Sequence, residues 1–146
     1  SKETVSKSNG VDKALRIEKF ANSADTLVIQ VEVSAGTPFS LLGNVAAQVD
    51  NKFAPLLRDT NDTSYLPIGW IYNDSDNYNY RYTPGEPITS VDQLGREKVG
   101  LSRSRTDQKL VLIYRVSKGV TINRFTIGNV SICVFDPMLP LTMDQR

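Results

Sequence analysis

"KLVLIYRVSKGVTINRFTIGNVSICVF", residues 109–135, is the stretch that decides the fold. It holds three runs rich in β-branched and aromatic residues, separated by the turn signals Ser-Lys-Gly and Gly-Asn. Such runs are typical of β-strands, and such short polar breaks are typical of tight turns. The sequence therefore predicts three consecutive antiparallel strands joined as a meander.

A strict alternation of apolar residues in two segments predicts the core. The first of the three runs, residues 109–116, and the segment "TLVIQVEV", residues 26–33, both repeat with the period of a half-buried strand. The side chains expected to point inward are Leu110, Leu112, Tyr114, Val116, Leu27, Ile29, Val31 and Val33.

The rest of the chain gives less regular signals. Residues 12–20 favour a strand over a single helical turn, and residues 39–49 favour one or two short strands. Residues 52–64 are expected to form a polar connection broken by a proline, and residues 83–108 a long loop. Residues 1–10 have almost no apolar content, which predicts a flexible arm or linker.

Many short strands, turn residues between them and no long helical period predict an all-β fold. The expectation is an antiparallel, immunoglobulin-like β-sandwich in a single domain, residues 11–146, with a small β-barrel as the alternative. The chain of 146 residues fits one domain of common size.

Composition and charge exclude several classes of partner. The chain has 17 basic and 16 acidic side chains and a formal charge of +1, so no long-range field favours nucleic acid or an anionic membrane. No segment is apolar for the length that a membrane-spanning helix needs. The single cysteine, Cys133, lies in an apolar run and is expected to act as a small buried hydrophobic residue.

The absence of histidine removes the usual general base and the commonest zinc ligand. No motif for a nucleotide, zinc or nucleophilic catalysis is present. We therefore expect no enzyme, no catalytic residues and no cofactor, and a small hydrolase built on carboxylates stays the third hypothesis for function.

The most prominent candidate site is an aromatic hairpin, "YLPIGWIYNDSDNYNYRY", residues 65–82. In two strands joined by a turn, Trp70 and Tyr72 share one face of the first strand, and Tyr78, Tyr80 and Tyr82 share one face of the second. This pattern predicts an aromatic ladder. The ladder either fills the space between two sheets or, if exposed, binds sugars or proline-rich peptide.

The turn of this hairpin, Asn73–Asn77, is rich in side-chain oxygens that calcium could use. It lacks the glycine and the bidentate glutamate of an EF-hand loop, and Asn and Asp are also the residues that turns prefer. We expect a turn and no metal site.

A second candidate site is a basic cluster in the long loop, where five cations are opposed by only Glu97 and Asp107. Arginines at alternate positions can hold phosphate or carboxylate groups. A solvated loop has the same composition, so both interpretations stay open. The residues of this hypothetical docking loop are Arg96, Lys98, Arg103, Arg105 and Lys109.

Four segments together carry a resemblance to a known family: "LVIQVEV", "TPFSLL", "PGEPI" and "KLVLIYRVSKGVTINRFTIG". In their order over residues 27–128 they resemble the telokin-like, immunoglobulin-fold accessory domains of bacterial surface and lipoprotein-associated proteins. The resemblance implies a non-catalytic domain in which "LIYRV" and "INRFTIG" close the sandwich. The cysteine–tryptophan–cysteine pattern of antibody domains is absent.

The expected function is a non-catalytic binding or protein–protein interaction module of a larger bacterial protein at the surface or outside the cytoplasm. Its partner would be a protein or a glycan. The alternative is a carbohydrate-binding module that uses the aromatic ladder.

Overall fold

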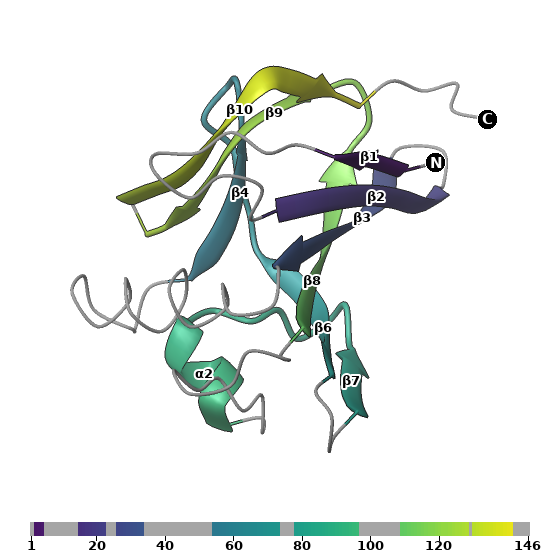
Figure 1. The fold of residues 1–146 in the computed structure, drawn as a ribbon, viewed down its shortest axis with the longest axis vertical. Helices are drawn as coiled ribbons and strands as arrows, with labels where there is room; N and C mark the ends of the chain where they lie inside the picture. Colours follow the sequence, from purple (N-terminus) through teal and green to yellow (C-terminus); the bar gives the residue numbers. More distant parts are fainter. Residues whose placement is uncertain are drawn as a thin grey trace.

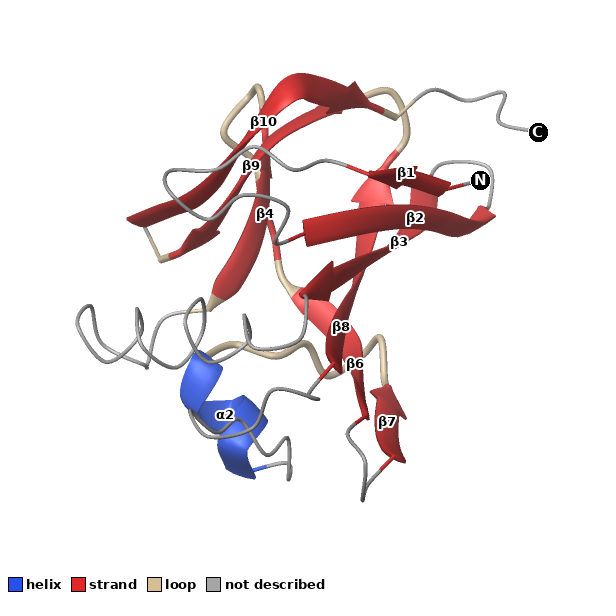
Figure 2. Ribbon diagram, viewed as in Figure 1, coloured by secondary structure: helices blue, strands red, loops and turns tan. Residues whose placement is uncertain are grey.

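The computed structural model describes residues 2–4, 15–22, 26–33, 54–73, 78–96, 109–128 and 130–141. They form two antiparallel sheets and one short helix (Figures 1 and 2). One sheet has the strand order β1-β2-β3-β8-β6-β7, and the other has the order β10-β9-β4-β5.

The six-stranded sheet consists of β1 (Lys2–Thr4), β2 (Leu15–Asn22), β3 (Thr26–Val33), β8 (Lys109–Ser117), β6 (Pro67–Asn73) and β7 (Tyr78–Tyr82). The four-stranded sheet consists of β10 (Val130–Pro140), β9 (Thr121–Ile127), β4 (Pro55–Asp59) and β5 (Ser64–Tyr65).

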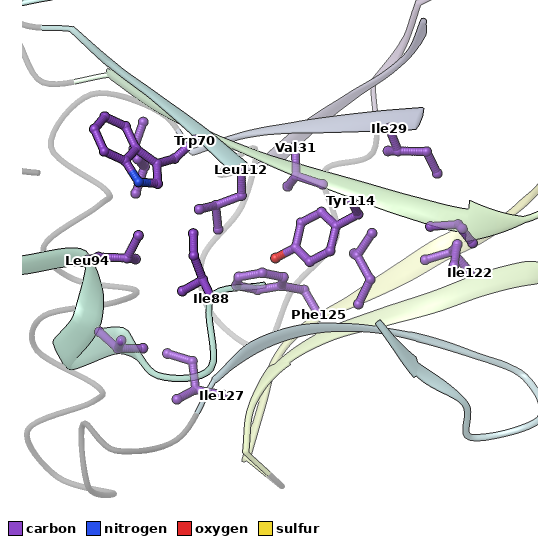
Figure 3. Close-up of a cluster of buried hydrophobic side chains, with 14 of the residues drawn as sticks. Ile29, Val31, Trp70, Ile88, Leu94, Leu112, Tyr114, Ile122, Phe125 and Ile127 are labelled. Carbon is purple, nitrogen blue, oxygen red and sulfur yellow. The ribbon is translucent and has the colours of Figure 1, made fainter. Parts of the chain in front are cut away.

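The hydrophobic core lies between the two sheets (Figure 3). Ile29 and Leu112 of the six-stranded sheet and Phe125 and Ile127 of the four-stranded sheet are all fully buried in one cluster. Burial of this apolar surface from both sides is the main force that holds two such sheets together. The arrangement is compatible with a β-sandwich, and the described strands do not close into the barrel that was the alternative.

The central pair of strands confirms the predicted core. β3 and β8 are antiparallel neighbours, with Ile29 opposite Tyr114 and Val31 opposite Leu112. All six predicted core residues whose side chains are described are buried, namely Ile29, Val31, Leu110, Leu112, Tyr114 and Val116. Tyr114 also links the sheets, since its hydroxyl donates a buried hydrogen bond of 3.0 Å to the carbonyl oxygen of Pro55 in β4.

The meander predicted for residues 109–135 is wrong in one respect. β9 and β10 pair as expected, but β8 belongs to the six-stranded sheet and β9 to the four-stranded sheet. The turn between β8 and β9 places Gly119 at a φ of 87°, and the Gly119 N–H donates to the carbonyl of Leu141. A turn signal in the sequence marks a change of direction, but it does not say whether the chain re-enters the same sheet.

Residues 52–64 also differ from the prediction, because Pro55–Asp59 forms β4 instead of a polar connection. Pro55 stands at the first position of the strand, where a missing N–H is tolerated. The strand alternates buried and partly buried residues, with Leu57 and Asp59 both buried. The segment reads as polar because Arg58 and Asp59 end the strand and the polar turn of residues 60–63 follows.

One of the two predictions for the N-terminal segments is confirmed, and the other is wrong in part. Leu15–Asn22 forms β2, as predicted for residues 12–20. In place of the flexible arm expected for residues 1–10, Lys2–Thr4 forms β1, which pairs with β2. Residues 5–10 and the short strands predicted for residues 39–49 lie outside the described residues. The extent of the domain stays a prediction.

The loop predicted for residues 83–108 contains a helix, α2 (Val91–Arg96). Val91 and Leu94 of this helix are buried in the core cluster, and the preceding Ile88 is fully buried; Figure 3 shows Leu94 and Ile88 there. The hydroxyl of Ser90 accepts the N–H of Gln93, a helix N-cap that the spacing Ser-x-x-Gln could have indicated. No helix within the described residues has the length and apolar character that spanning a membrane requires.

Candidate functional site

The register of the β6–β7 hairpin divides the five predicted site aromatics between two faces. Tyr80 lies opposite Ile71, and Trp70 lies opposite Arg81. Directly opposed residues project to the same face of a sheet, and neighbours along a strand project to opposite faces. The five aromatic residues therefore do not form one ladder. Trp70 and Tyr72 face the core, and the three tyrosines of β7 face the other way.

The inward-facing pair is part of the core, where Figure 3 shows Trp70. Trp70 is 4% exposed and Tyr72 is 1% exposed, so neither ring is accessible to a ligand. Arg81 shares this face. Its guanidinium donates to the hydroxyl of Thr83 at 2.6 Å and also to the backbone carbonyl of Glu86. Trp70 and Tyr72 therefore fill the space between the two sheets, which is one of the two roles expected for the aromatic ladder.

The outward-facing aromatics belong to β7, the strand at the edge of the six-stranded sheet (Figure 1). Tyr78, Tyr80 and Tyr82 are 63%, 70% and 47% exposed, respectively. The ring centres of Tyr78 and Tyr80 are 6.4 Å apart, and their planes are inclined by 47°. We call these three residues the tyrosine face. Their exposure agrees with the other role expected for the aromatic ladder, that of side chains accessible to a ligand.

A pocket of about 400 Å³ adjoins the tyrosine face on the outer side of the sheet. Three apolar side chains line it from three different strands: Val28 of β3, Ile71 of β6 and Ile113 of β8. Gln30 adds an amide. The lining is therefore mainly apolar and aromatic, with one neutral polar side chain beside the tyrosine hydroxyls, which is the composition typical of small binding sites.

Tyr82 is held in place across the strand that separates it from β8. Its hydroxyl accepts a hydrogen bond of 2.9 Å from the guanidinium of Arg115. Gly69 lies opposite Tyr82 in β6, and Arg115 is on β8 beyond it. Because glycine has no side chain, the phenol ring can pass over β6. A Cβ atom at Gly69 would clash with the carbonyl oxygen of Arg81, so β7 lies too close to β6 for any other residue there.

Of the described charges on this outer face, two form an ion pair and one is hydrogen-bonded to neutral groups. Lys109 of β8 lies 3.6 Å from the carboxylate of Glu32 in β3, and Arg115 is engaged with Tyr82. Arg81 is the single lining residue that carries a charge, and its side chain projects to the opposite face of the sheet, beside Trp70. The chemistry that this site can offer is therefore apolar contact, ring stacking and neutral hydrogen bonding.

Only two of the five residues of the hypothetical docking loop, Arg96 and Lys109, are among the described residues. Lys109 is exposed and ion-paired with Glu32. Arg96 ends α2, and nothing is known of its side chain. The remaining three residues, Lys98, Arg103 and Arg105, lie outside the described residues, so the docking loop stays a prediction.

The predictions for metal and for cysteine likewise stay open. In the Asn73–Asn77 turn only the flanking Asn73 is described, at the exposed end of β6. Among the side chains that the structure describes, no three acidic, cysteine or histidine residues cluster in a way that could hold a metal ion. Cys133 lies in β10, but its side chain is not among those described.

A second polar cluster closes the β4–β5 hairpin. The carboxylate of the buried Asp59 accepts the N–H groups of Asn61 and Thr63 at 2.8 and 2.9 Å and the hydroxyl of Tyr65 at 2.9 Å. Burial, and then the hydrogen bond to Asp59, raise the pKa of Tyr65 to about 12. All these contacts stay within one turn, which indicates a structural role.

Asp62 in the same turn has a φ of 64° and accepts a hydrogen bond of 2.8 Å from Arg124 in β9. This hydrogen bond is the main cause that lowers the pKa of the exposed Asp62 carboxyl. The contact ties the turn to β9.

The pocket lining was missed by the sequence analysis, although a signal for it exists. Residues 110–114 are apolar at every position, whereas a strand with one solvent-exposed face alternates. Val111 and Ile113 project to the outer face and are still largely buried. Val28 is likewise an apolar residue on the face of β3 that carries Gln30 and Glu32. These interruptions indicate an outer face that is apolar near β8.

No protein-family model matches this chain, and neither the curated proteins nor the solved structures that were searched contain a match. The resemblance to telokin-like accessory domains therefore stays a prediction. The functional argument depends on the site itself.

Proposed function

We propose that this chain is a non-catalytic binding module whose ligand lies on the tyrosine face and in the adjoining pocket. The observation that carries the proposal is the exposure of Tyr78, Tyr80 and Tyr82 on one strand beside a pocket of about 400 Å³. Large aromatic side chains exposed in a group are unusual on a surface with no partner, and tyrosine is enriched in interfaces.

Three further features support a binding role over a purely structural one. The three rings are not needed to fill the core, because Trp70 and Tyr72 already occupy the inner face of the same hairpin. Tyr82 is fixed by Arg115, so the face is partly preorganised. The pocket is apolar at Ile71 and Ile113, where a ligand side chain would be removed from water.

A glycan is the second candidate ligand, because tyrosine rings can stack on sugar rings and Gln30 could accept or donate hydrogen bonds to hydroxyl groups. Two observations favour a polypeptide. The planes of Tyr78 and Tyr80 are inclined by 47°, so the two rings do not form the flat platform that an extended glycan needs. The pocket lining offers few polar groups for the many hydroxyls of a sugar.

The proposal is tested with a variant in which Tyr78, Tyr80 and Tyr82 are all replaced by alanine. The probes are a random displayed peptide library and a panel of soluble oligosaccharides. The matched control replaces two exposed hydrophobic residues of β10, Val134 and Met138, by alanine. Binding of either probe that is lost in the tyrosine variant and retained in the β10 control supports the proposal. Binding that survives in the tyrosine variant overturns it.

The assignment to a larger bacterial protein at the cell surface or outside the cytoplasm stays a prediction from the sequence.

A further inference from the structure

The backbone of β7 adds a second chemical feature to the tyrosine face. β7 is the last strand of its sheet, and among the described residues no strand pairs with its outer edge. The N–H of Thr83, which continues the strand, donates to the carbonyl of Ile68 in the direction of β6. A Cβ atom built on Gly69 of β6 would clash with the carbonyl oxygen of Arg81, so this group also points toward β6.

Backbone groups in a strand alternate in direction, and each residue directs its N–H and C=O to the same side. Since Arg81 and Thr83 direct theirs to β6, the N–H and C=O groups of Tyr78, Tyr80 and Tyr82 point to the outer edge. The same three residues therefore present aromatic rings on one face and main-chain hydrogen-bonding groups at the edge.

β7 also lacks most of the features that usually protect an edge strand from pairing. Such edges carry proline, a bulge or an inward-pointing charge, or are only two or three residues long. β7 has one of these features, the inward-facing Arg81, whose charge is paired with Glu86. β5 has two residues, and β10 carries Pro137, Pro140 and two register shifts against β9. β7 has five residues, pairs with β6 in continuous register and contains no proline.

Resting on the proposed function, we infer that the ligand is an extended, uncharged peptide segment that pairs with the outer edge of β7 as an added strand. Main-chain pairing of this kind gives affinity, and alternate side chains of the peptide give specificity. In such a pair the peptide residues opposite Tyr78, Tyr80 and Tyr82 project beside the tyrosine rings. The paired charges of Lys109 and Glu32 and the apolar pocket favour uncharged side chains at those positions.

A second copy of the chain is a less suitable occupant. Pairing of two β7 strands across a two-fold axis would join only five residues from each copy. A stable interface needs roughly 1,000 Å² or more of buried surface, which a strand of this length does not provide on its own. It would also place tyrosine beside tyrosine and leave the pocket at Ile71 and Ile113 unfilled.

The experiment separates the ring of Tyr80 from its N–H group. Tyr80→Ala removes the ring and keeps the N–H, whereas Tyr80→Pro removes both. Proline is tolerated at an edge position whose N–H faces away from the sheet. Both variants are titrated with one synthetic peptide, the sequence most enriched from the displayed library on the wild-type protein, and thermal unfolding monitors the fold of each.

We expect Tyr80→Pro to bind this peptide roughly three- to tenfold more weakly than Tyr80→Ala, the effect of one main-chain hydrogen bond. A second arm uses the wild-type protein and N-methylated versions of the peptide, which need no change in the protein. Methylation at alternate positions should abolish binding, and methylation at the positions between them should not.

Three different results would contradict strand pairing, the peptide ligand or the proposed function itself. If Tyr80→Ala weakens binding but the Pro variant and the N-methyl series show no further or alternating loss, the tyrosine face binds the peptide without strand pairing, and the inference is wrong. If oligosaccharides bind in place of peptides, or if the protein forms dimers that Tyr80→Pro dissociates, the peptide assignment is wrong. If peptide binding is indifferent to all tyrosine variants, the proposed function fails as well.

Discussion

Tyr80 faces Ile71 across the β6–β7 pair, on the side of the sheet away from Trp70. This register assigns the two strands of one aromatic hairpin to two tasks. β6 contributes Trp70 and Tyr72 to the core, and β7 contributes three tyrosines to the surface. A shift of β7 by one residue against β6 would turn the three tyrosines to the core face, whereas the pairing of β6 with β8 would keep Trp70 and Tyr72 there.

Gly69 is the residue through which this register can be perturbed most directly. We predict that Gly69→Ala destabilises the fold by about 1 to 3 kcal/mol, because the new Cβ atom would meet the β7 backbone. Gly85→Ala is the control, since a Cβ atom there has no neighbour within 4 Å. Urea denaturation measures both variants. Equal stabilities would mean that β7 does not pack against β6 as closely as described.

Leu112 lies at the centre of the core, opposite both Val31 and Trp70. Leu112→Ala should lower the free energy of unfolding by about 2 to 5 kcal/mol, through lost burial and the cavity that remains. Val134→Ala removes methyl groups from an exposed side chain of β10 and should change the free energy of unfolding by less than about 0.5 kcal/mol. A loss below that limit for Leu112→Ala would refute the assignment of the core.

The hydrogen bond from Tyr114 to Pro55 connects the two sheets inside the core. Tyr114→Phe keeps the ring and removes the donor, which leaves a buried carbonyl with one partner fewer. We expect a loss of about 1 to 3 kcal/mol in the free energy of unfolding. Tyr80→Phe removes an exposed hydroxyl and is the comparison. An unchanged midpoint in Tyr114→Phe would show that the sheets are not coupled at this point.

Tyr65 provides a test at alkaline pH. Its pKa in the folded protein is raised from 10.0 to about 12, chiefly by burial, so the folded state holds this proton more tightly than the unfolded state does. The stabilisation is therefore complete below pH 10 and is lost as the pH rises from 10 to 12. The difference in unfolding free energy between wild type and Tyr65→Phe should shrink over this interval. A constant difference would contradict the raised pKa.

Much of the fold follows from local pattern. The alternation at residues 26–33 and 109–116 specifies two neighbouring strands and their inner faces, and the aromatic hairpin is paired as expected. The sheet to which each strand belongs does not follow. The Ser-Lys-Gly turn looks the same whether β9 returns beside β8 or crosses to the second sheet, because that choice depends on contacts distant in sequence.

For the candidate site, the sequence predicts which aromatic residues share a face, but not which of the two groups lies in the core. Alternation along each strand groups Tyr78, Tyr80 and Tyr82, and it groups Trp70 with Tyr72. Which group meets the core depends on the cross-strand register, and that depends on the length of the turn. The pocket lining comes from four strands that span more than 80 positions in the chain, from Val28 to Ile113. A sequence pattern of one segment cannot reveal such a site.

The most direct test of the tyrosine face is a map of backbone amide chemical shifts by nuclear magnetic resonance during titration with the enriched peptide. The account predicts changes confined to β7 and to the residues around Ile71, Ile113 and Val28. The amides of the four-stranded sheet, such as those of Leu57 and Phe125, should not shift. Shifts centred on the four-stranded sheet or on residues 97–108, with β7 unaffected, would contradict the central claim.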